Sequence, residues 1–190
     1  MTWFKNNSYA IVKMLIYQFG VAILGMILTV ATLDKKGLGL MVSIYTLVFY
    51  LILLYMMTWE IGAKERIRAD AGIVRYDPFN GLKLSLCANI PNFLIFLFML
   101  IGYLFGVVFA EAAWAQGMVS ITHGIGIIWE SMYTGIINTL ISTDASYLTG
   151  WYVLAYALAP LPAILASALG CLLGSHNKRI FGKLTGTKKS

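Results

Sequence analysis

Long apolar runs separated by short polar stretches divide this chain into helical segments. Four of these runs supply at least the ~20 mainly apolar residues that a helix needs to cross the hydrocarbon core of a membrane. We therefore predict an all-α integral membrane protein, organised as one polytopic membrane domain over residues 1–190, with a compact bundle of four transmembrane helices. The predicted spans cover residues 9–33, 37–59, 84–110 and 147–174.

Residues 118–143 form a fifth segment with a mixed pattern. Apolar and polar side chains both recur there at intervals of three, four and seven residues, which predicts an amphipathic helix. We predict that it lies within an outer segment, residues 111–146, either on the outer face or as a re-entrant helix; a fifth crossing is the alternative. The apolar positions are Ile121, Ile125, Ile128, Met132 and Ile136, and the polar positions are Ser120, His123, Glu130, Thr134 and Asn138.

The basic residues decide between four and five spans. Of the 14, 12 gather near the N-terminus, in an inner loop over residues 60–83 and in a tail over residues 175–190, and none lies between Lys83 and Lys178. Only Lys35 and Lys36 fall on the predicted outer side, where Asp34 partly offsets them. Four spans place all three groups on one side, but five would leave the tail on the other. Because Lys and Arg beside span ends favour the cytoplasmic side, we predict four spans with cytoplasmic N- and C-termini. The expected location is a cell membrane, namely the bacterial plasma membrane (cell inner membrane).

Composition excludes several classes of protein. Hydrophobic residues make up 59% of the chain and charged residues only 12%, about half of the ~25% that is usual in soluble domains. The net charge of +6 lies mainly at span ends, so it indicates orientation and contact with anionic headgroups. The expected partners are therefore the lipid bilayer and either further copies of the chain or a larger membrane complex, with no nucleic acid.

The inner loop is the most polar segment and begins with a run of mixed charge. Its candidate partner-docking residues are Glu60, Lys64, Arg66, Arg68 and Asp70. Glu60 and Lys64 are four residues apart in the order that supports a helix. The run is either an amphipathic continuation of the second span or a docking surface for a partner protein.

Two predicted spans contain helix-breaking residues. Asn89, Pro91 and Asn92 interrupt the third span, and Pro160 and Pro162 interrupt the fourth. Proline removes a backbone hydrogen bond, and irregular backbone at membrane depth needs a cavity or a cover of protein. These five residues are candidate substrate-binding residues; a kink that only shapes packing is the alternative.

His123 and Glu130 complete the candidate substrate-binding set. They lie seven residues apart on one face of the fifth segment and form a ligand or proton-handling pair, or else part of a polar stripe that faces water. Metal sites usually have three or four ligands, so we expect neither a metal nor another cofactor.

Small residues recur along the fourth span and in one pair of the third. Such residues let helix backbones approach closely in a membrane, where lipid offers no hydrophobic drive for association. The series comprises Ala155, Ala159, Ala163, Ala166, Gly170 and Gly174, and the pair is Gly102 and Gly106.

Three functions follow as hypotheses. The first is a transport-type subunit that binds or conducts a small solute, alone as an oligomer or with a partner. The second is a non-transporting accessory or assembly subunit of a larger membrane complex. A membrane enzyme is disfavoured, because the sequence contains no recognisable catalytic motif, and no catalytic residues are assigned.

Overall fold

A computed structural model describes residues 2–32, 36–108, 113–141 and 150–178, and within these ranges every regular element is a helix. An all-α fold is confirmed. Parts of several predictions lie outside the described residues: both ends of the outer segment, the last residues of the third span, the first of the fourth, and residues 179–190 of the basic tail.

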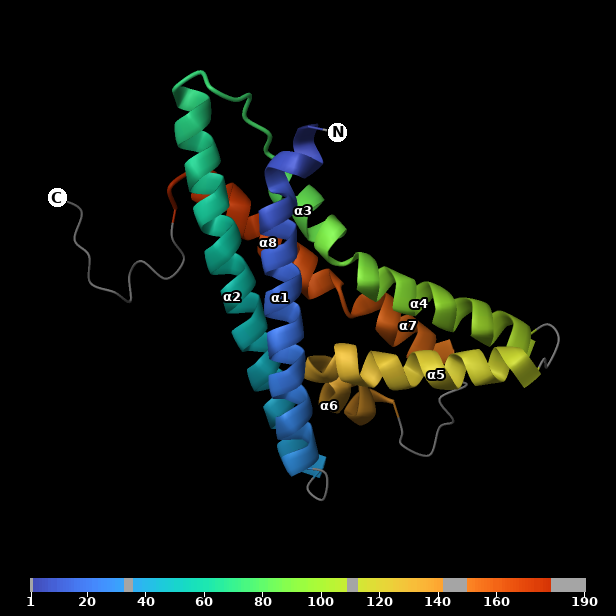
Figure 1. The fold of residues 1–190 in the computed structure, drawn as a ribbon. Helices are drawn as coiled ribbons and strands as arrows, with labels where there is room; N and C mark the ends of the chain where they lie inside the picture. Colours follow the sequence, from blue (N-terminus) through green and yellow to red (C-terminus); the bar gives the residue numbers. More distant parts are fainter. Residues whose placement is uncertain (1, 33–35, 109–112, 142–149, 179–190) are drawn as a thin grey trace.

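Two long helices form one side of the molecule: α1 (Thr2–Ala31) and α2 (Lys36–Asp70) run side by side and antiparallel (Figure 1). Helix α2 continues past the predicted end of the second span to Asp70, so the mixed-charge run is a continuation of that helix, and the start of the predicted inner loop is helical. Gly72 stops the helix at φ +73°, where the N–H of Ile73 donates to the carbonyl of Arg68. This left-handed closure favours glycine.

The predicted third span consists of two helices with a bend between them. Helix α3 (Asn80–Ala88) and helix α4 (Ile90–Tyr103) meet at Asn89, and the bend between α3 and the stretch Ile90–Gly106 is 52°. Pro91 lies in the first turn of α4, where its missing N–H costs no helical hydrogen bond. A π-helical turn, η1 (Leu104–Val108), follows α4.

The remaining helices are also arranged as two broken pairs. Helix α5 (Ala113–Trp129) and helix α6 (Ser131–Leu140) are separated at Glu130, and helix α7 (Gly150–Leu158) and helix α8 (Leu161–Ser175) are separated at Ala159 and Pro160. The fifth segment is therefore not one continuous amphipathic helix. Figure 1 shows α5 crossing α1 at a steep angle, with α6 beside the far part of the α1–α2 pair.

Three described stretches are long and apolar enough to cross a membrane: Trp3–Ala31, Gly37–Asp70 and Gly150–Ser175. The bent pair of α3 and α4 passes the same test if its two parts form one span. These lengths support a membrane location for the chain.

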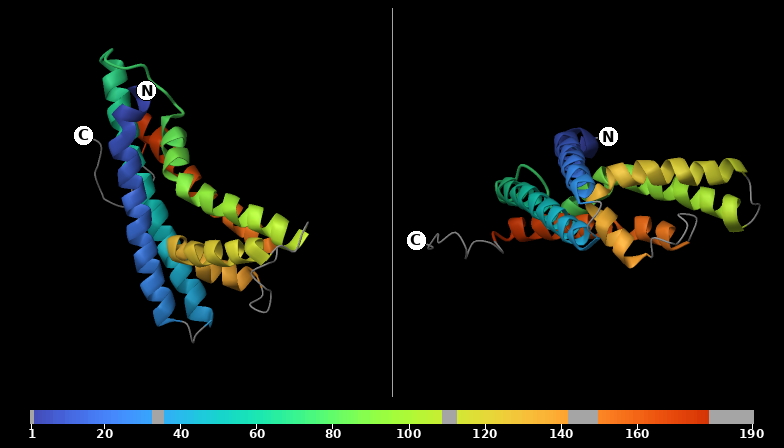
Figure 2. Two further views of the ribbon diagram at one scale, coloured as in Figure 1. Left: turned by 45° about the vertical axis from the view of Figure 1, so that its right-hand side comes forward. Right: turned by 90° about the horizontal axis from the view of Figure 1, so that it is seen from below.

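The buried apolar residues form two separate clusters. The first joins α1, α2, α3, α6 and α8, and includes Met14, Leu54, Leu84 and Met132. The second joins α4, α5 and α7, and includes Met99. Figure 2 shows the corresponding shape, with α4 and α5 diverging together from the α1–α2 pair. Each broken pair contributes one helix to each cluster, so the three breaks lie where the clusters meet.

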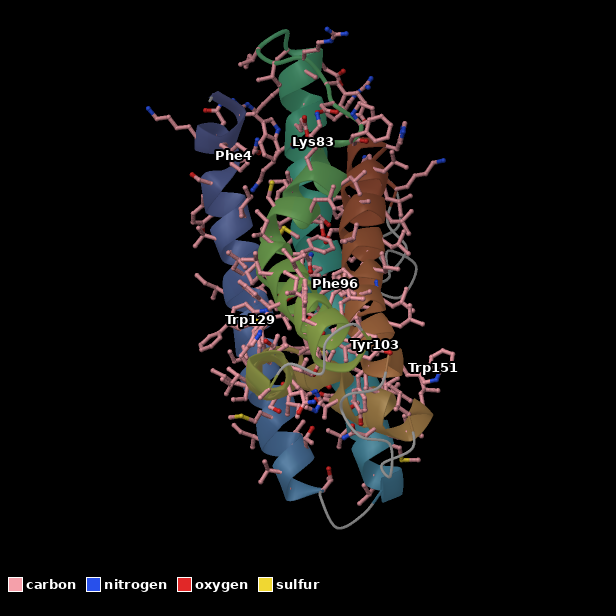
Figure 3. The ribbon with its side chains drawn as sticks, turned by 90° about the vertical axis from the view of Figure 1, so that its right-hand side faces the viewer. Phe4, Lys83, Phe96, Tyr103, Trp129 and Trp151 are labelled. Atoms are coloured by element: carbon pink, nitrogen blue, oxygen red, sulfur yellow. The ribbon has the colours of Figure 1, made fainter. Side chains whose placement is uncertain are left out.

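Hydrogen bonds bring the described parts of the basic islands to one end of the bundle. The indole N–H of Trp3 donates to Asn80 at 3.0 Å, which joins the start of α1 to the start of α3. The Trp59 indole donates to the carbonyl of Lys178 at 2.8 Å, which joins α2 to the chain beyond α8. Figure 3 shows Phe4 and Lys83 near this end and Trp129 and Trp151 farther along.

The predicted small-residue packing of the fourth span is confirmed inside the chain. A Cβ atom at Gly174 would overlap the backbone of Trp59, and one at Gly170 would overlap α2 at Tyr55 and Thr58. Gly102 and Gly106 face α5 in the same way. Backbone approach therefore fixes α8 on α2 and α4 on α5.

Candidate functional site

The break between α5 and α6 buries a carboxylate. Glu130 is 1% exposed, and neither of its carboxylate oxygens has a hydrogen-bond partner among the described residues. An isolated carboxylate is costly to bury unless it is protonated or balanced by a cation. The interpretation of Glu130 as part of a stripe facing water is wrong, because α6 packs this position inward against the bundle.

Tight packing of α6 explains the burial. The Ser131 hydroxyl donates to the carbonyl of Ala22 in α1, and the N–H of Gly135 donates to the Ser43 hydroxyl in α2 at 2.9 Å. A Cβ at Gly135 would overlap the backbone of Gly39. Contacts on both sides of α6 thus hold its first turn, and Glu130 before it, in the interior.

Three buried tyrosines on neighbouring helices lie close enough to Glu130 to feel its charge. Tyr50 comes from α2, Tyr133 from α6 and Tyr156 from α7, and each interacts electrostatically with Glu130. All three are buried, and the Tyr133 hydroxyl has no hydrogen-bond partner among the described residues. Glu130 forms no ion pair with any residue of the described ranges.

A network of amide side chains reaches the residue before Glu130. Asn92 Oδ1 accepts from Gln18 Nε2 at 2.6 Å and from the indole N–H of Trp129, the residue before Glu130, at 2.7 Å. Asn92 Nδ2 donates to Asn89 Oδ1 at 2.8 Å. The network thus joins α1, α4 and α5 at the point where α3 and α4 bend.

The bend itself depends on Asn89. Its side-chain amide donates to the carbonyl of Ser85 at 2.8 Å, one turn back in α3, and to the Ser85 hydroxyl at 3.3 Å. Asparagine side chains compete in this way with the regular helical ladder. With Pro91 two residues later, the local sequence favours a break here, and Asn89 and Asn92 are both buried within it.

His123 is connected to the site through a tyrosine. Its Nδ1 lies 3.5 Å from the Tyr156 hydroxyl, and its ring also meets Tyr152 edge-on at 5.1 Å between centroids. His123 is thus linked to Tyr156, which also lies within the electrostatic influence of Glu130.

The prolines of the fourth span lie at the break between α7 and α8. Pro160 is almost fully buried at the break between α7 and α8, four residues after Tyr156, and Pro162 is half-buried in the first turn of α8. Pro91 is half-buried next to Asn92. All three prolines lie at or next to a helix break.

The candidate docking residues lie elsewhere, at the end of α2. Lys64 pairs with Glu60 at 3.8 Å, and Arg66 pairs with Asp70 at 3.1 Å, all with exposed side chains. Arg68 is exposed without an ion pair among the described residues. These residues share one helix end and do not approach Glu130.

Sequence reasoning missed five participants: Gln18, Trp129, Tyr50, Tyr133 and Tyr156. Gln18 carried a usable signal, because it is an isolated amide inside the first apolar span. The tyrosines carried none, since aromatic residues are frequent throughout the spans.

Within the described ranges, no group of three or more His, Cys, Asp or Glu residues could hold a metal ion. Comparison with protein-family models, with curated proteins and with solved structures yielded no match.

Proposed function

We propose that this protein is a transport-type membrane subunit that binds a small positively charged solute at Glu130. One observation carries the proposal: a fully buried carboxylate with no hydrogen-bond partner for either oxygen among the described residues. Ionisable groups inside membrane proteins are costly and mark substrate, ion or proton pathways. A cation bound at Glu130 balances the charge and removes that cost.

The arrangement of helices supports the same function. Three helix breaks, at Asn89, Glu130 and Pro160, lie where the two apolar clusters meet. Transporters commonly build their sites from discontinuous helices, because the freed backbone groups and inserted polar side chains can line a cavity. Buried polar side chains at these breaks, the amides of Gln18, Asn89 and Asn92 among them, are consistent with such a site.

The proposed topology has four spans and a re-entrant element. The spans are α1, α2, the bent pair α3–α4 and the pair α7–α8, and the re-entrant element is α5–α6. Ile121, Ile125 and Ile128 support the re-entrant placement, because they are 67%, 52% and 56% exposed on the face of α5 opposite the bundle. An apolar outer face and a buried carboxylate suit lipid on the outside of α5. We propose cytoplasmic termini in the bacterial plasma membrane from the charge distribution.

A binding assay with a matched variant tests the proposed function. Purified protein in neutral detergent is titrated with alkali cations, ammonium and small alkylammonium ions, and thermal unfolding is recorded. We expect at least one cation to stabilise the wild type in proportion to its saturation, and Glu130→Gln to abolish this response. Asp77→Asn, which removes a carboxylate at the far end of the bundle, should retain it. An identical cation response in wild type and Glu130→Gln would contradict the proposal.

A role as an accessory subunit is the second candidate, favoured by the end of α2. Ile67 is 69% exposed there between the two intrahelical ion pairs, which gives a docking surface an apolar centre and a charged rim. Affinity purification from native membranes distinguishes the candidates. The accessory role would be favoured over transport if wild type is recovered in a stoichiometric complex and the Ile67→Glu variant is not.

A further inference from the structure

A groove at the basic end of the bundle is independent of the Glu130 site. It has a volume of about 900 Å³ and lies between the start of α1, the end of α2 and the loop that leads into α3. Figure 1 shows these three segments converging at one end of the molecule. Four basic side chains and two carboxylates line it, and one of the four, Lys64, pairs with Glu60 outside the groove, so an excess of positive charge remains. The basic residues are Lys64, Arg68, Arg75 and Lys83.

Both carboxylates of the groove already have partners. Glu65 accepts from Asn80 at 2.9 Å, and Asp77 accepts from Lys83 at 2.5 Å. Lys83 is therefore neutralised by Asp77. Arg68 and Arg75, in contrast, have no ion pair or hydrogen bond with any other described residue. Two guanidinium groups thus remain available for an anion in one groove.

The groove combines these charges with exposed aromatic surface. Tyr9 and Phe79 line it and are 78% and 63% exposed, and Ile73, next to its wall, is 67% exposed. Tyrosine side chains such as Tyr9 favour the headgroup level of a membrane. A small soluble anion would make no use of this apolar surface, whereas a lipid presents a phosphate and an acyl-glycerol part together.

We propose that this groove binds the phosphate headgroup of an anionic lipid through Arg68 and Arg75. Guanidinium groups bind phosphate oxygens in bidentate geometry, and the exposed aromatic residues cover the glycerol and the first part of the chains. The position at the end of the bundle with the basic islands places the site at headgroup level. A bound lipid would hold α1, α2 and the loop before α3 together.

Native mass spectrometry of retained lipid tests this site. Protein in neutral detergent is titrated with phosphatidylglycerol or phosphatidylcholine, and the bound fraction is measured for wild type, Arg68→Gln, Arg75→Gln and Arg66→Gln. Arg66 is the control, because it pairs with Asp70 and does not itself line the groove; it touches the groove wall only through the Tyr76 ring. We expect wild type to prefer phosphatidylglycerol, and Arg68→Gln and Arg75→Gln each to weaken it about five-fold, the ratio that follows from about 1 kcal/mol per basic residue near an anionic surface.

Several results would overturn the proposal. Equal binding of both lipids by wild type would remove the anion preference. Equal losses in all three arginine variants would indicate a diffuse charge effect rather than this groove. Displacement of the lipid by millimolar inorganic phosphate would identify a soluble-anion site instead. Thermal unfolding of each variant without lipid checks the fold. Because Arg68 and Arg75 are exposed and unpaired, their substitution should leave the unfolding temperature unchanged.

Discussion

Trp129 donates its indole N–H to Asn92 Oδ1 at 2.7 Å, which joins the last residue of α5 to the first turn of α4. The two residues are 37 positions apart in the chain. Glu130 follows Trp129 directly, so this hydrogen bond connects the amide network at the α3–α4 bend with the buried carboxylate. Asn92, a residue predicted from sequence, thus bonds to the residue before Glu130, through an aromatic side chain that sequence reasoning did not select.

Glu130→Met should stabilise the protein in the absence of solute. Methionine has a similar shape but no charge, so it removes the cost of a buried, unpartnered carboxylate, which we put at about 1–3 kcal/mol. Thermal and denaturant unfolding in neutral detergent measure the change. Glu65→Met is the matched control, because Glu65 has a partner in Asn80, and its removal should destabilise the fold. Destabilisation by Glu130→Met would show that Glu130 supports the fold rather than a ligand.

Asn92→Leu should destabilise the fold by about 1–2 kcal/mol. The change removes three hydrogen bonds and leaves the donors of Gln18 and Trp129 unpaired, and polar contacts in membranes average about 0.6 kcal/mol each. Asn138→Leu, at an exposed position of α6, should change stability by less than about 0.5 kcal/mol. A double-mutant cycle of Gln18→Leu with Asn92→Leu measures their coupling. Additive effects of the two substitutions would argue against the network.

Gly174→Ala should destabilise the fold by about 1–3 kcal/mol, the range for overpacking. The added methyl group would meet the backbone of Trp59 in α2, which cannot yield as a flexible side chain can. The control is Gly20→Ala in α1, where a Cβ meets nothing within 4 Å and helix propensity favours alanine. Unfolding of both variants in the same detergent gives the comparison. Similar stabilities would mean that α2 and α8 are farther apart in the membrane.

Asp77 should make a small contribution to stability that depends on pH. The hydrogen bond from Lys83 holds the pKa of Asp77 below its ordinary value. Its contribution is therefore present at neutral pH and is lost as the pH falls through that lowered pKa. Because both side chains are partly exposed, Asp77→Asn should cost at most about 1 kcal/mol at pH 7. The difference between wild type and variant should shrink in acid; a constant difference across pH would exclude the ion pair as its source.

Spin labels along α5 should report membrane depth consistent with a re-entrant element. Labels at Ile121, Ile125 and Ile128 face away from the bundle, so they should contact lipid, and depth should first increase and then decrease from α5 through α6. Accessibility to oxygen and to a water-soluble nickel complex measures this profile. A constant shallow depth would indicate an interfacial helix, and a steady passage from one face to the other would indicate a fifth span.

The sequence alone determined the all-helical class, the long apolar segments typical of a membrane protein, and the residues at which two of those segments break. Apolar length and charge distribution are local properties, so four apolar runs and three basic islands can be read without knowing any contact. The same holds for the bend at Asn89 and for the continuation of α2, because proline, asparagine and glycine act on the adjacent backbone.

Only the tertiary structure decided which polar side chains meet. The pattern placed Glu130 on one polar face with Thr134 and Asn138, yet the helix breaks at Glu130, and Asn138 is exposed while Glu130 is buried. The cause is the contact of Ser131 and Gly135 with α1 and α2, across more than 90 residues of chain. Burial of a charge depends on such distant packing, and periodicity within a single helix contains no information about it.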